Sequence, residues 1–540
     1  MENSIERIPE PKTVNYQRSV TFDDALSMTK FGKFNYILII ISGTILTSVL
    51  LETLGISYVI PVAECDLLLT TKEKGVLSAV AFAGIIASSH LWGFLADTRG
   101  RKKVIVPTLF LTFAATVISS FTSNFWIITI LRFFAGFFIS GSSATIYAYL
   151  GEFHNKRNGS RAIMGASFVF GVGCLLLPGI AFSIINQEWE FTVPYLDVVY
   201  RPWRLFLVVC GLPNLVCAFT LLKFPESPKF VFTQGNPEKA IETIQWMHKL
   251  NTSGKESKLQ IASILDENEP QQTKDRRSEE NDSNGFRVLM KLVWDQTAPL
   301  FMSPYLNKTA IVCILQFGIY LSSNGLYMFF PDIINRVAEV QEGGSNKTTI
   351  CHAVYETQAK MSAFESNFTE TMPECNQKLD IMAYEHSFIL ELLYALGFAV
   401  IGLIINAVGK LPILVFVFFC CGLSGVLITF IDVPFIAVWL YVILLTCGYC
   451  INVVNAVTVD LFPTNLRAMA VCISLMFGRL GSVVGANLVG VLLDTHCDLT
   501  FWISGISLIS CGILSFFIPN IYKRNPSGPR ISVSSNISSR

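Results

Sequence analysis

A few charged side chains lie inside long apolar segments of this 540-residue chain. Placing a charge in a membrane costs about 2.5–3.5 kcal/mol on insertion scales, so each is a candidate for binding a solute or an ion. Glu52 could carry a proton or attract a cation, or it could form a structural hydrogen bond to a neighbouring helix. Glu391 is a further candidate site residue. Arg132 stands near one end of its apolar segment, where it could reach interfacial water in a structural role.

A second set of polar residues is neutral and could line a cavity. These residues are Gln316, Tyr320, Asn324, Tyr327, Asn452 and Asn455. The first four recur at helical spacing and fall on one face of a helix. Such a stripe could hydrogen-bond a sugar or another polar organic solute, or it could bond neighbouring helices to one another.

The elements that hold these residues are apolar segments long enough to cross a bilayer. Hydrophobic residues make up 52% of the chain and charged residues only 15%, against about a quarter charged in soluble domains. A helix that spans a bilayer needs about 20 apolar residues. The sequence therefore predicts an all-α membrane protein with twelve spans, at 34–60, 75–96, 104–122, 125–150, 162–186, 204–223, 307–331, 385–408, 410–431, 433–460, 469–495 and 499–519.

Short basic loops set the predicted orientation, because loops rich in lysine and arginine stay in the cytoplasm. Such loops follow spans 2 and 4, and a basic segment follows span 12. Both ends of the chain are then cytoplasmic, and we expect no cleavable signal peptide because the first 33 residues lack an apolar core. The predicted segments are a tail at 1–33, a six-helix bundle at 34–223, a cytoplasmic loop at 224–306, a second six-helix bundle at 307–519 that includes an external loop at 332–384, and a tail at 520–540.

The external loop carries signals of extracellular or luminal chemistry. Asn346 and Asn367 each begin a glycosylation sequon, and Cys351 and Cys375 could form a disulfide bond there. Another sequon, at Asn251, falls on the cytoplasmic side and should stay unused.

The cytoplasmic loop contains a predicted amphipathic helix. Asn236 is a candidate N-cap, and Pro237 suits the first helical position. Apolar residues then recur at helical spacing as far as Met247, so we expect a short helix lying under the bundle.

The sequence contains no motif for enzymatic chemistry. It has no phosphate-binding loop, no cluster of metal-ligating residues and no nucleophile elbow, so we expect no enzyme, no metal and no cofactor. Basic and acidic residues number 40 each, so the net charge gives no reason to expect a nucleic-acid partner. The expected partners are the lipid bilayer, a small organic solute and, through Glu52, protons.

Three motifs carry a resemblance to a known family. Residues 93–103 read Gly-Phe-Leu-Ala-Asp-Thr-Arg-Gly-Arg-Lys-Lys, residues 224–229 read Phe-Pro-Glu-Ser-Pro-Lys, and residues 460–467 read Asp-Leu-Phe-Pro-Thr-Asn-Leu-Arg. They follow spans 2, 6 and 10, and they resemble the signature segments of major facilitator transporters, in particular the sugar and organic-ion porters. The resemblance implies two six-helix bundles that hold a solute between them near the membrane midplane, and span 7 would line that cavity.

The resemblance also implies that these motifs gate the cytoplasmic side. The gating residues would be Gly93, Asp97, Arg99, Gly100, Arg101, Glu152, Arg161, Glu226, Asp460 and Arg467. Asp97 would face the positive end of a helix in the same half, and Arg101 would reach acids near the end of span 4, such as Glu152. In the second half the signature is reduced to Gly409 and Lys410 without its acid, so we expect an intact gate in the first half alone.

A closer resemblance is to the synaptic vesicle glycoprotein 2 family. Residues 55–66, Lys74-Gly75 and Leu91-Trp92-Gly93 are similar to it. Its members carry a buried glutamate where Glu52 stands, but they also have an acid where this chain has Val49. The resemblance implies a transporter of an organic ion or a sugar-like solute, or a non-transporting vesicle component that keeps the fold. As in organic-ion porters, Arg479 would face an anionic group. The expected location is the plasma membrane or a cytoplasmic or secretory vesicle membrane.

Overall fold

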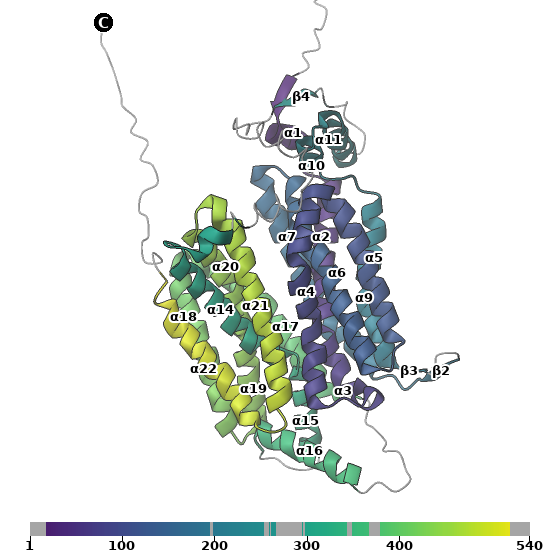
Figure 1. Ribbon diagram of the computed structural model, residues 1–540, viewed down its shortest axis with the longest axis vertical. Coiled ribbons are helices and arrows are strands. Elements are labelled where there is room, and N and C mark those ends of the chain that lie inside the picture. Colours follow the sequence, from purple (N-terminus) through teal and green to yellow (C-terminus); the bar gives the residue numbers. More distant parts are fainter. Residues whose placement is uncertain are drawn as a thin grey trace, which may run out of the picture.

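The computed structural model describes residues 18–194, 198–252, 259, 261–265, 294, 297–342, 348–366 and 378–518. Within these residues, twelve helical segments are long and apolar enough to cross a membrane. They begin within a few residues of the predicted starts, which confirms the fold class. Figure 1 shows them as two bundles lying side by side, the first in purple to blue and the second in green to yellow.

The first bundle is formed by the helices between residues 33 and 222. They are α2 (Lys33–Leu54), α3 (Ile56–Leu67), α4 (Thr71–Arg99), α5 (Arg101–Ser120), α6 (Phe125–Glu152), α7 (Lys156–Cys174), α8 (Leu176–Ile185) and α9 (Pro202–Leu222). The first span combines α2 and α3, which meet at Gly55. A side chain there would collide with the Leu51 carbonyl oxygen, because an added Cβ would lie 2.3 Å from it.

The second bundle is formed by the helices after residue 305. They are α14 (Leu306–Tyr327), α17 (Ile381–Val408), α18 (Lys410–Leu427), η2 (Ile428–Phe430), α19 (Pro434–Leu445), η3 (Thr446–Gly448), α20 (Tyr449–Leu461), α21 (Thr464–Leu492) and α22 (Cys497–Ser515). A short 3-10 turn, η3, joins α19 and α20 into one span.

Shorter elements lie at the ends of the bundles. Those on the predicted cytoplasmic side are β1 (Arg18–Thr21), α1 (Phe22–Met28), α10 (Pro228–Thr233), α11 (Pro237–Asn251), β4 (Ile261–Leu265) and η1 (Ala298–Phe301). Those on the opposite, predicted external side are β2 (Phe191–Val193), β3 (Val198–Tyr200), α15 (Phe330–Glu342) and α16 (Ile350–Ser366). The strand β1 pairs in parallel with β4, and β2 pairs antiparallel with β3. In Figure 1, β4, α1, α10 and α11 gather above the first bundle.

The helix α11 lies where the apolar spacing predicts it and packs against the first bundle. Its apolar face is buried, and the Trp246 ring lies 5.5 Å from the Phe34 ring of α2. Pro237 opens the first turn. Asn236 occupies the N-cap position, as predicted, but its side chain makes no capping hydrogen bond.

Asn251, at the end of α11, ties that helix to the bundle. Its side-chain oxygen accepts a hydrogen bond from the Phe34 N–H at 2.9 Å, and its Nδ2 donates to Asn35 Oδ1 at 2.9 Å. Asn35 Nδ2 in turn lies 3.0 Å from His154 Nε2, and His154 Nδ1 lies 2.8 Å from the Leu150 carbonyl oxygen. The side-chain amide of Asn251, whose sequon is predicted to be cytoplasmic, is therefore engaged in hydrogen bonds within the protein.

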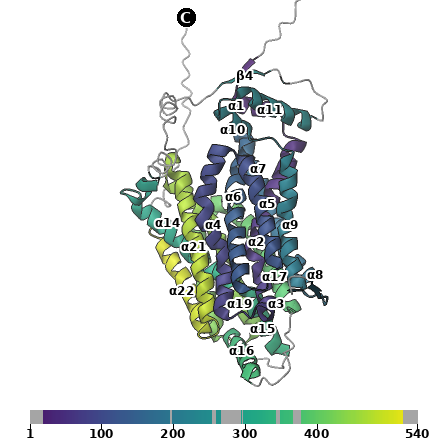
Figure 2. The same cartoon turned by 45° about the vertical axis from the view of Figure 1, so that its right-hand side comes forward.

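The two bundles contact each other at their predicted external ends. Tyr58 of α3 stacks on Tyr384 of α17 with ring centroids 6.2 Å apart. Asn186 exchanges hydrogen bonds of 2.8 and 3.2 Å with the backbone just before α17. Gly75 and Gly490 bring α4 and α21 into contact, because a Cβ on Gly490 would lie 2.7 Å from the Gly75 Cα. Figure 2 also shows α4 and α21 side by side. These contacts close the external side of the interface.

A disulfide bond joins the external segment to the last span. Cys351 of α16 is bonded to Cys497 at the start of α22. The predicted pairing of Cys351 with Cys375 is therefore wrong, and Cys375 itself lies outside the described residues. The two bonded cysteines are 146 residues apart, so spacing along the chain does not show that folding brings them together. The predicted glycosylation sites, Asn346 and Asn367, also lie outside the described residues.

Candidate functional site

Glu52 forms a buried network inside the first bundle. Its carboxylate lies 2.9 Å from Arg132 Nη1 and accepts hydrogen bonds from Thr116 Oγ1 at 2.9 Å and from Asn214 Nδ2 at 3.2 Å. Arg132 also donates to the Glu52 carbonyl oxygen. Both charged side chains are 2% exposed, so the network holds α2, α5, α6 and α9 together. This geometry supports the structural interpretation of Glu52. The expectation that Arg132 reaches interfacial water is wrong, because Glu52 holds it in the bundle interior.

The polar stripe on α14 is bonded to its neighbours in the second bundle. Gln316 Nε2 donates to Asn455 Oδ1 of α20 at 2.8 Å, and Asn324 Nδ2 donates to Ser482 Oγ of α21 at 3.1 Å. Asn452, also on α20, is exposed to the surroundings of the bundle and forms no hydrogen bond with this stripe. Gln316 and Asn324 therefore join helices to one another. The two tyrosines of the stripe, Tyr320 and Tyr327, lie instead near the charged residues described next.

Glu391 of α17 is a buried carboxylate with a single hydrogen-bond donor. It is 4% exposed, and Tyr327 Oη donates to it at 2.5 Å. In the part of the chain that the structure describes, no lysine, arginine or histidine lies within ion-pair distance of its oxygens. Burying a charge costs free energy unless the charge is paired. Glu391 is therefore suited to take up a proton or a cationic group.

The surroundings of Glu391 come from both bundles. The helix α17, which carries Glu391, contacts α7 and α8 of the first bundle, and its Tyr384 stacks on Tyr58 of α3. The Tyr58 hydroxyl lies near Ser387 but forms no hydrogen bond of acceptable geometry with a described residue. Glu391 therefore lies at the interface between the bundles, where this fold places its solutes.

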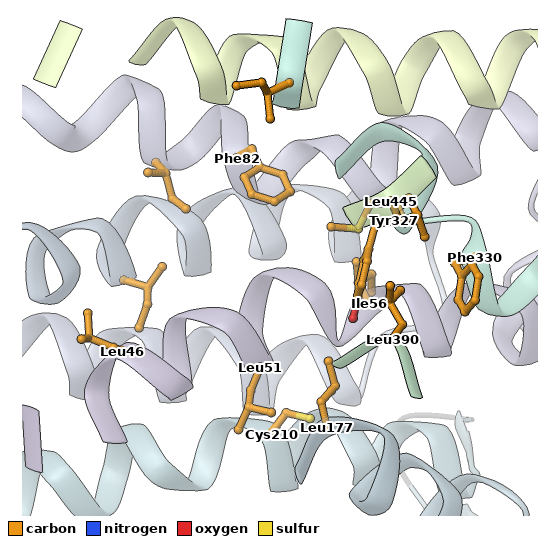
Figure 3. Packing of buried hydrophobic residues seen from close by; sticks show 14 of the residues in the cluster. Leu46, Leu51, Ile56, Phe82, Leu177, Cys210, Tyr327, Phe330, Leu390 and Leu445 are labelled. Atoms are coloured by element: carbon orange, nitrogen blue, oxygen red, sulfur yellow. The ribbon is translucent and has the colours of Figure 1, made fainter. Parts of the chain in front are cut away.

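Aromatic rings cover Glu391 on its external side. Tyr384 lies two turns before Glu391 on α17, stacks on Tyr58, and meets the Phe182 ring of α8 edge-on at 5.5 Å. Figure 3 shows apolar side chains from three helices beside Tyr327, namely Ile56, Leu390 and Leu445. These side chains bury Glu391, which is 4% exposed.

Arg479 of α21 is a second charge at the interface. Its Nη1 donates to Ser89 Oγ of α4 at 3.0 Å, which links the two bundles. The neighbouring Gly478 packs closely against the Tyr320 ring, because an added Cβ would lie 2.6 Å from that ring. Among the described residues, no carboxylate lies within ion-pair distance of Arg479. Its guanidinium is therefore left without an anionic partner.

The first-half motif forms a corner on the predicted cytoplasmic side. Arg101 Nη2 lies 2.9 Å from Glu152 Oε1 and 3.1 Å from Asp97 Oδ1, so the expected contact between Arg101 and Glu152 is present. The Asp97 side chain is 75% exposed. It therefore does not pack against the positive end of another helix in this conformation, contrary to expectation.

Glu226 binds the same corner from the segment after span 6. Its carboxylate accepts hydrogen bonds from the Lys102 N–H at 2.9 Å and the Ser227 N–H at 3.0 Å. Gly100 has φ +110°, and an added Cβ would lie 2.5 Å from Glu226 Oε2. Both facts require glycine at this turn. Three other predicted gating residues are exposed or border open space, namely Gly93, Arg99 and Arg161.

The second half keeps an equivalent corner. Gly409 has φ +94°, and Lys410 Nζ lies 2.5 Å from Asp460 Oδ2. An ion pair therefore joins the start of α18 to the end of α20, as Arg101 and Glu152 join α5 to α6. The expectation of an intact corner in the first half alone is wrong, because Lys410 and Asp460 replace the missing pair. The side chain of Arg467 lies outside the described residues.

Sequence reasoning missed a charge cluster at the external end of the interface. Lys74 of α4 is 0% exposed and lies 2.6 Å from Glu64 and 3.9 Å from Asp332 of α15. Arg336 lies 3.2 Å from Asp332 and 3.1 Å from Asp494. Although burial opposes it, the nearby Arg336 and Lys74 hold the pKa of Asp332 below its ordinary value. The four-residue spacing of Asp332 and Arg336 is the signal that could have found this cluster.

Comparison with known sequences gives consistent matches. The family model described as "Sugar (and other) transporter" matches residues 21–368. Synaptic vesicle glycoprotein 2B of Homo sapiens is 26% identical over 391 residues, which cover 71% of this chain and 56% of that protein. Synaptic vesicle glycoprotein 2A of Rattus norvegicus is 25% identical over 325 residues, which cover 58% and 44%. The chain thus spans about half the length of the curated relatives that it matches.

Solved structures share the fold at low sequence identity. The inward open conformation of the xylose transporter XylE from E. coli matches with a TM-score of 0.60 and 13% identity, over 92% of this chain and 96% of that one. A bacterial homolog of the human lysosomal transporter Spinster, in an inward-facing and occupied conformation, matches with a TM-score of 0.58 and 12% identity, over 91% and 98%. At these identities the likeness concerns the fold alone.

Proposed function

Because this chain belongs to the sugar (and other) transporter family of the major facilitator superfamily, we propose that it is a secondary transporter that moves a small organic solute by alternating access. The solute is an organic ion or a sugar-like molecule. Relatives of this kind keep the fold while carrying different solutes, so the solute must be argued from the site rather than from the fold.

The observation that carries this proposal is the position of Glu391. A buried carboxylate without a cationic partner is costly in a membrane and is a functional candidate by default. Glu391 also lies where side chains of both bundles meet, since Tyr58 comes from the first and Tyr327 from the second. A purely structural acid would be expected to have a partner, as Glu52 has in Arg132.

The contacts between the bundles support an inward-facing conformation. On the external side, Tyr58 stacks on Tyr384, and Lys74 approaches Asp332 across the interface. Transport requires these contacts to break when the bundles rock toward the outward-facing state. The cytoplasmic corners at Arg101 and Lys410 would then receive partners from the opposite half, which gives their exposed acids, Asp97 and Asp460, a gating role.

If transport is coupled to protons, we propose that Glu391 is the residue that binds the proton. A related fold is that of a D-xylose-proton symporter, which this chain matches with a TM-score of 0.54 and 15% identity. Glu52 was the first candidate for a proton carrier, but its oxygens are occupied by Arg132, Thr116 and Asn214. Glu391 has one hydrogen-bond donor and is therefore free to take up a proton or a cationic group.

Uptake into proteoliposomes tests the proposal. The purified full chain is reconstituted, and uptake of a panel of organic cations, anions, zwitterions and sugars is measured with and without a pH gradient. We expect uptake of at least one member, and we expect Glu391→Gln to reduce it to the background rate. Glu385→Gln is the matched control, because Glu385 is an exposed acid on the same helix, and this variant should transport normally.

Two outcomes would contradict the proposal. Absence of uptake for every solute, from protein that is folded by its thermal unfolding profile, would favour a non-transporting vesicle component that keeps the fold. Equal uptake by the wild type and Glu391→Gln would remove Glu391 from the site while leaving a transporter.

The protein is a multi-pass membrane protein. The cellular membrane in which it resides is a further point that we propose. We propose the plasma membrane or a secretory vesicle membrane, and the names of the relatives, synaptic vesicle glycoproteins, support the vesicle. Fractionation of cells that make the tagged full chain distinguishes the two. Recovery with endoplasmic reticulum or mitochondrial markers at steady state would contradict both.

A further inference from the structure

Two opposite charges at the interface lack partners in the described protein. Glu391 has only the Tyr327 hydroxyl as a donor. Arg479 has the Ser89 hydroxyl, which compensates none of its charge. By contrast, the buried acid Glu52 of the first bundle is paired directly with Arg132. Each unpaired buried charge costs free energy, and here an acid and a base of the same bundle both lack a partner of opposite charge.

The helix α14 connects the two unmatched charges. The Tyr320 ring of α14 packs against Gly478, the residue before Arg479, and Tyr327 of the same helix donates to Glu391. These tyrosines are seven residues apart, which is two helical turns and a rise of about 10 Å. They lie on one face of α14, since a seven-residue step returns to nearly the same direction. Glu391 and Arg479 therefore border the same side of one helix, on the order of 10 Å apart along its axis.

Both charges also face the first bundle. Arg479 reaches Ser89 of α4, and α17, which carries Glu391, packs against α7 and α8 and stacks its Tyr384 on Tyr58 of α3. A solute held between the bundles would therefore be within reach of either group. The aromatic rings near Glu391 add attraction for an ammonium group, because cations are drawn to the faces of aromatic rings.

We propose that Glu391 and Arg479 are the two poles of one solute site, and that the solute is zwitterionic, with an ammonium group held at Glu391 and an anionic group held at Arg479. This inference rests on the proposed transport function and specifies its solute class. Each pole disfavours the wrong solute. A simple cation leaves Arg479 unmatched, a simple anion leaves Glu391 unmatched, and a neutral sugar leaves both unmatched.

A matched set of permanently charged probes tests the inference. The probes are 6-(trimethylammonio)hexanoate as the zwitterion, hexyltrimethylammonium as the cation, hexanesulfonate as the anion and D-xylose as the neutral sugar. Binding to the detergent-purified full chain is measured by thermal stabilisation, and uptake is measured in proteoliposomes. We expect the zwitterion to stabilise the wild type at the lowest concentration, with apparent affinity about tenfold or more above each single-charge probe.

Single substitutions should change the charge preference rather than abolish all binding. Arg479→Gln should make hexyltrimethylammonium bind at least as well as the zwitterion, and Glu391→Gln should do the same for hexanesulfonate. Glu391→Asp and Arg479→Lys keep the charges and should keep the zwitterion preference, which separates loss of charge from loss of fold. Glu385→Gln should behave as wild type.

The inference and the proposed function fail in different ways. Preference for D-xylose, or a charge preference that neither Glu391→Gln nor Arg479→Gln alters, overturns the zwitterion site while transport stands. Binding of none of the four probes by folded wild-type protein also overturns the site. Transport itself fails only if the broad panel of solutes gives no uptake.

Discussion

Substitution of Arg132 tests whether its buried ion pair with Glu52 stabilises the fold or takes part in transport. Removing it in Arg132→Met leaves the Glu52 carboxylate buried without its cation, and breaking such a pair costs about 3–5 kcal/mol. We therefore expect a marked fall in the thermal unfolding midpoint of the detergent-purified protein. The double variant Glu52→Gln with Arg132→Met removes both charges and should recover part of the loss. Arg161→Met, at an exposed arginine of the same bundle, should change little.

An unchanged unfolding midpoint for Arg132→Met, together with lost uptake, would contradict the structural role of the pair. Glu52 would then return as a candidate for proton coupling. The contrast with Glu391 rests on partners alone, since both acids are buried and both stand in spans.

Gly100 and Gly409 give a second prediction for single residues. Both have positive φ with an extended ψ, at +110° and 151° and at +94° and 161°. A non-glycine residue in this region costs about 1–3 kcal/mol. Gly100→Ala should cost more than Gly409→Ala, because its Cβ would also meet Glu226 at 2.5 Å whereas the nearest atom to Gly409 is at 3.8 Å.

The unfolding midpoints of the two alanine variants check this order. Gly402→Ala in α17 is the control, because it borders open space within a helix and alanine favours helices there. A larger loss for Gly409→Ala than for Gly100→Ala would show that the Glu226 contact does not constrain this turn.

The attachment of α11 to the bundle should depend on pH through His154. Burial lowers the pKa of His154 from its ordinary 6.5, and its Nε2 faces the Asn35 amide nitrogen as an acceptor. A base whose folded pKa is lowered contributes stability that is fully present above its ordinary pKa and lost as pH falls through the folded value. Protonation would turn Nε2 into a donor facing another donor, and Asn35 also holds Asn251.

Hydrogen exchange of the α11 amides measures this effect. Protection should fall between about pH 7.5 and about pH 5.5 after correction for intrinsic exchange, since histidine changes charge in this range. In His154→Gln, protection should be insensitive to pH over the same range. Protection of wild-type α11 that rises or stays level as pH falls would disprove the role of His154.

The positions of the membrane-spanning helices can be predicted well from the sequence, whereas the contacts between these helices cannot. Twelve spans follow from hydropathy because each apolar run must cross the bilayer by itself. Hydropathy does not say which face of a span meets which neighbour. That limit explains why Arg132 was expected at the interface with water and not beside Glu52, and why Cys351 was assigned the wrong cysteine. The contacts of Arg101 with Asp97 and Glu152 could be predicted more readily, because these acids lie in or next to recognisable motifs.

At the scale of the whole molecule, rocking of the bundles should be stopped by a link across their external ends. Lys378 and Glu188 form an exposed ion pair between the two halves at 2.5 Å. In Glu188→Cys with Lys378→Cys, a reducible bis-methanethiosulfonate cross-linker should hold the external side closed. We expect uptake to fall to the background rate on cross-linking and to return on reduction.

Each single cysteine variant, treated with the same reagent, is the control and should keep its uptake. Full uptake by the cross-linked double variant would mean that the external ends do not separate during transport. The site at Glu391 would then have to be reached without rocking of the bundles.

The hydrogen bonds of Asn251 have a consequence for biogenesis. If a newly made chain were inserted upside down, the sequon at Asn251 would enter the lumen, where its amide would receive a glycan. A glycan on that nitrogen would replace a donor that Asn35 and Lys30 use, so α11 could no longer dock. Misinsertion would thus leave a covalent glycan on α11, and that glycan would prevent α11 from packing against the bundle. Inverted molecules would be trapped as unfinished products and exposed to quality control, and the correctly oriented ones would escape because their Asn251 never meets the glycosylation machinery.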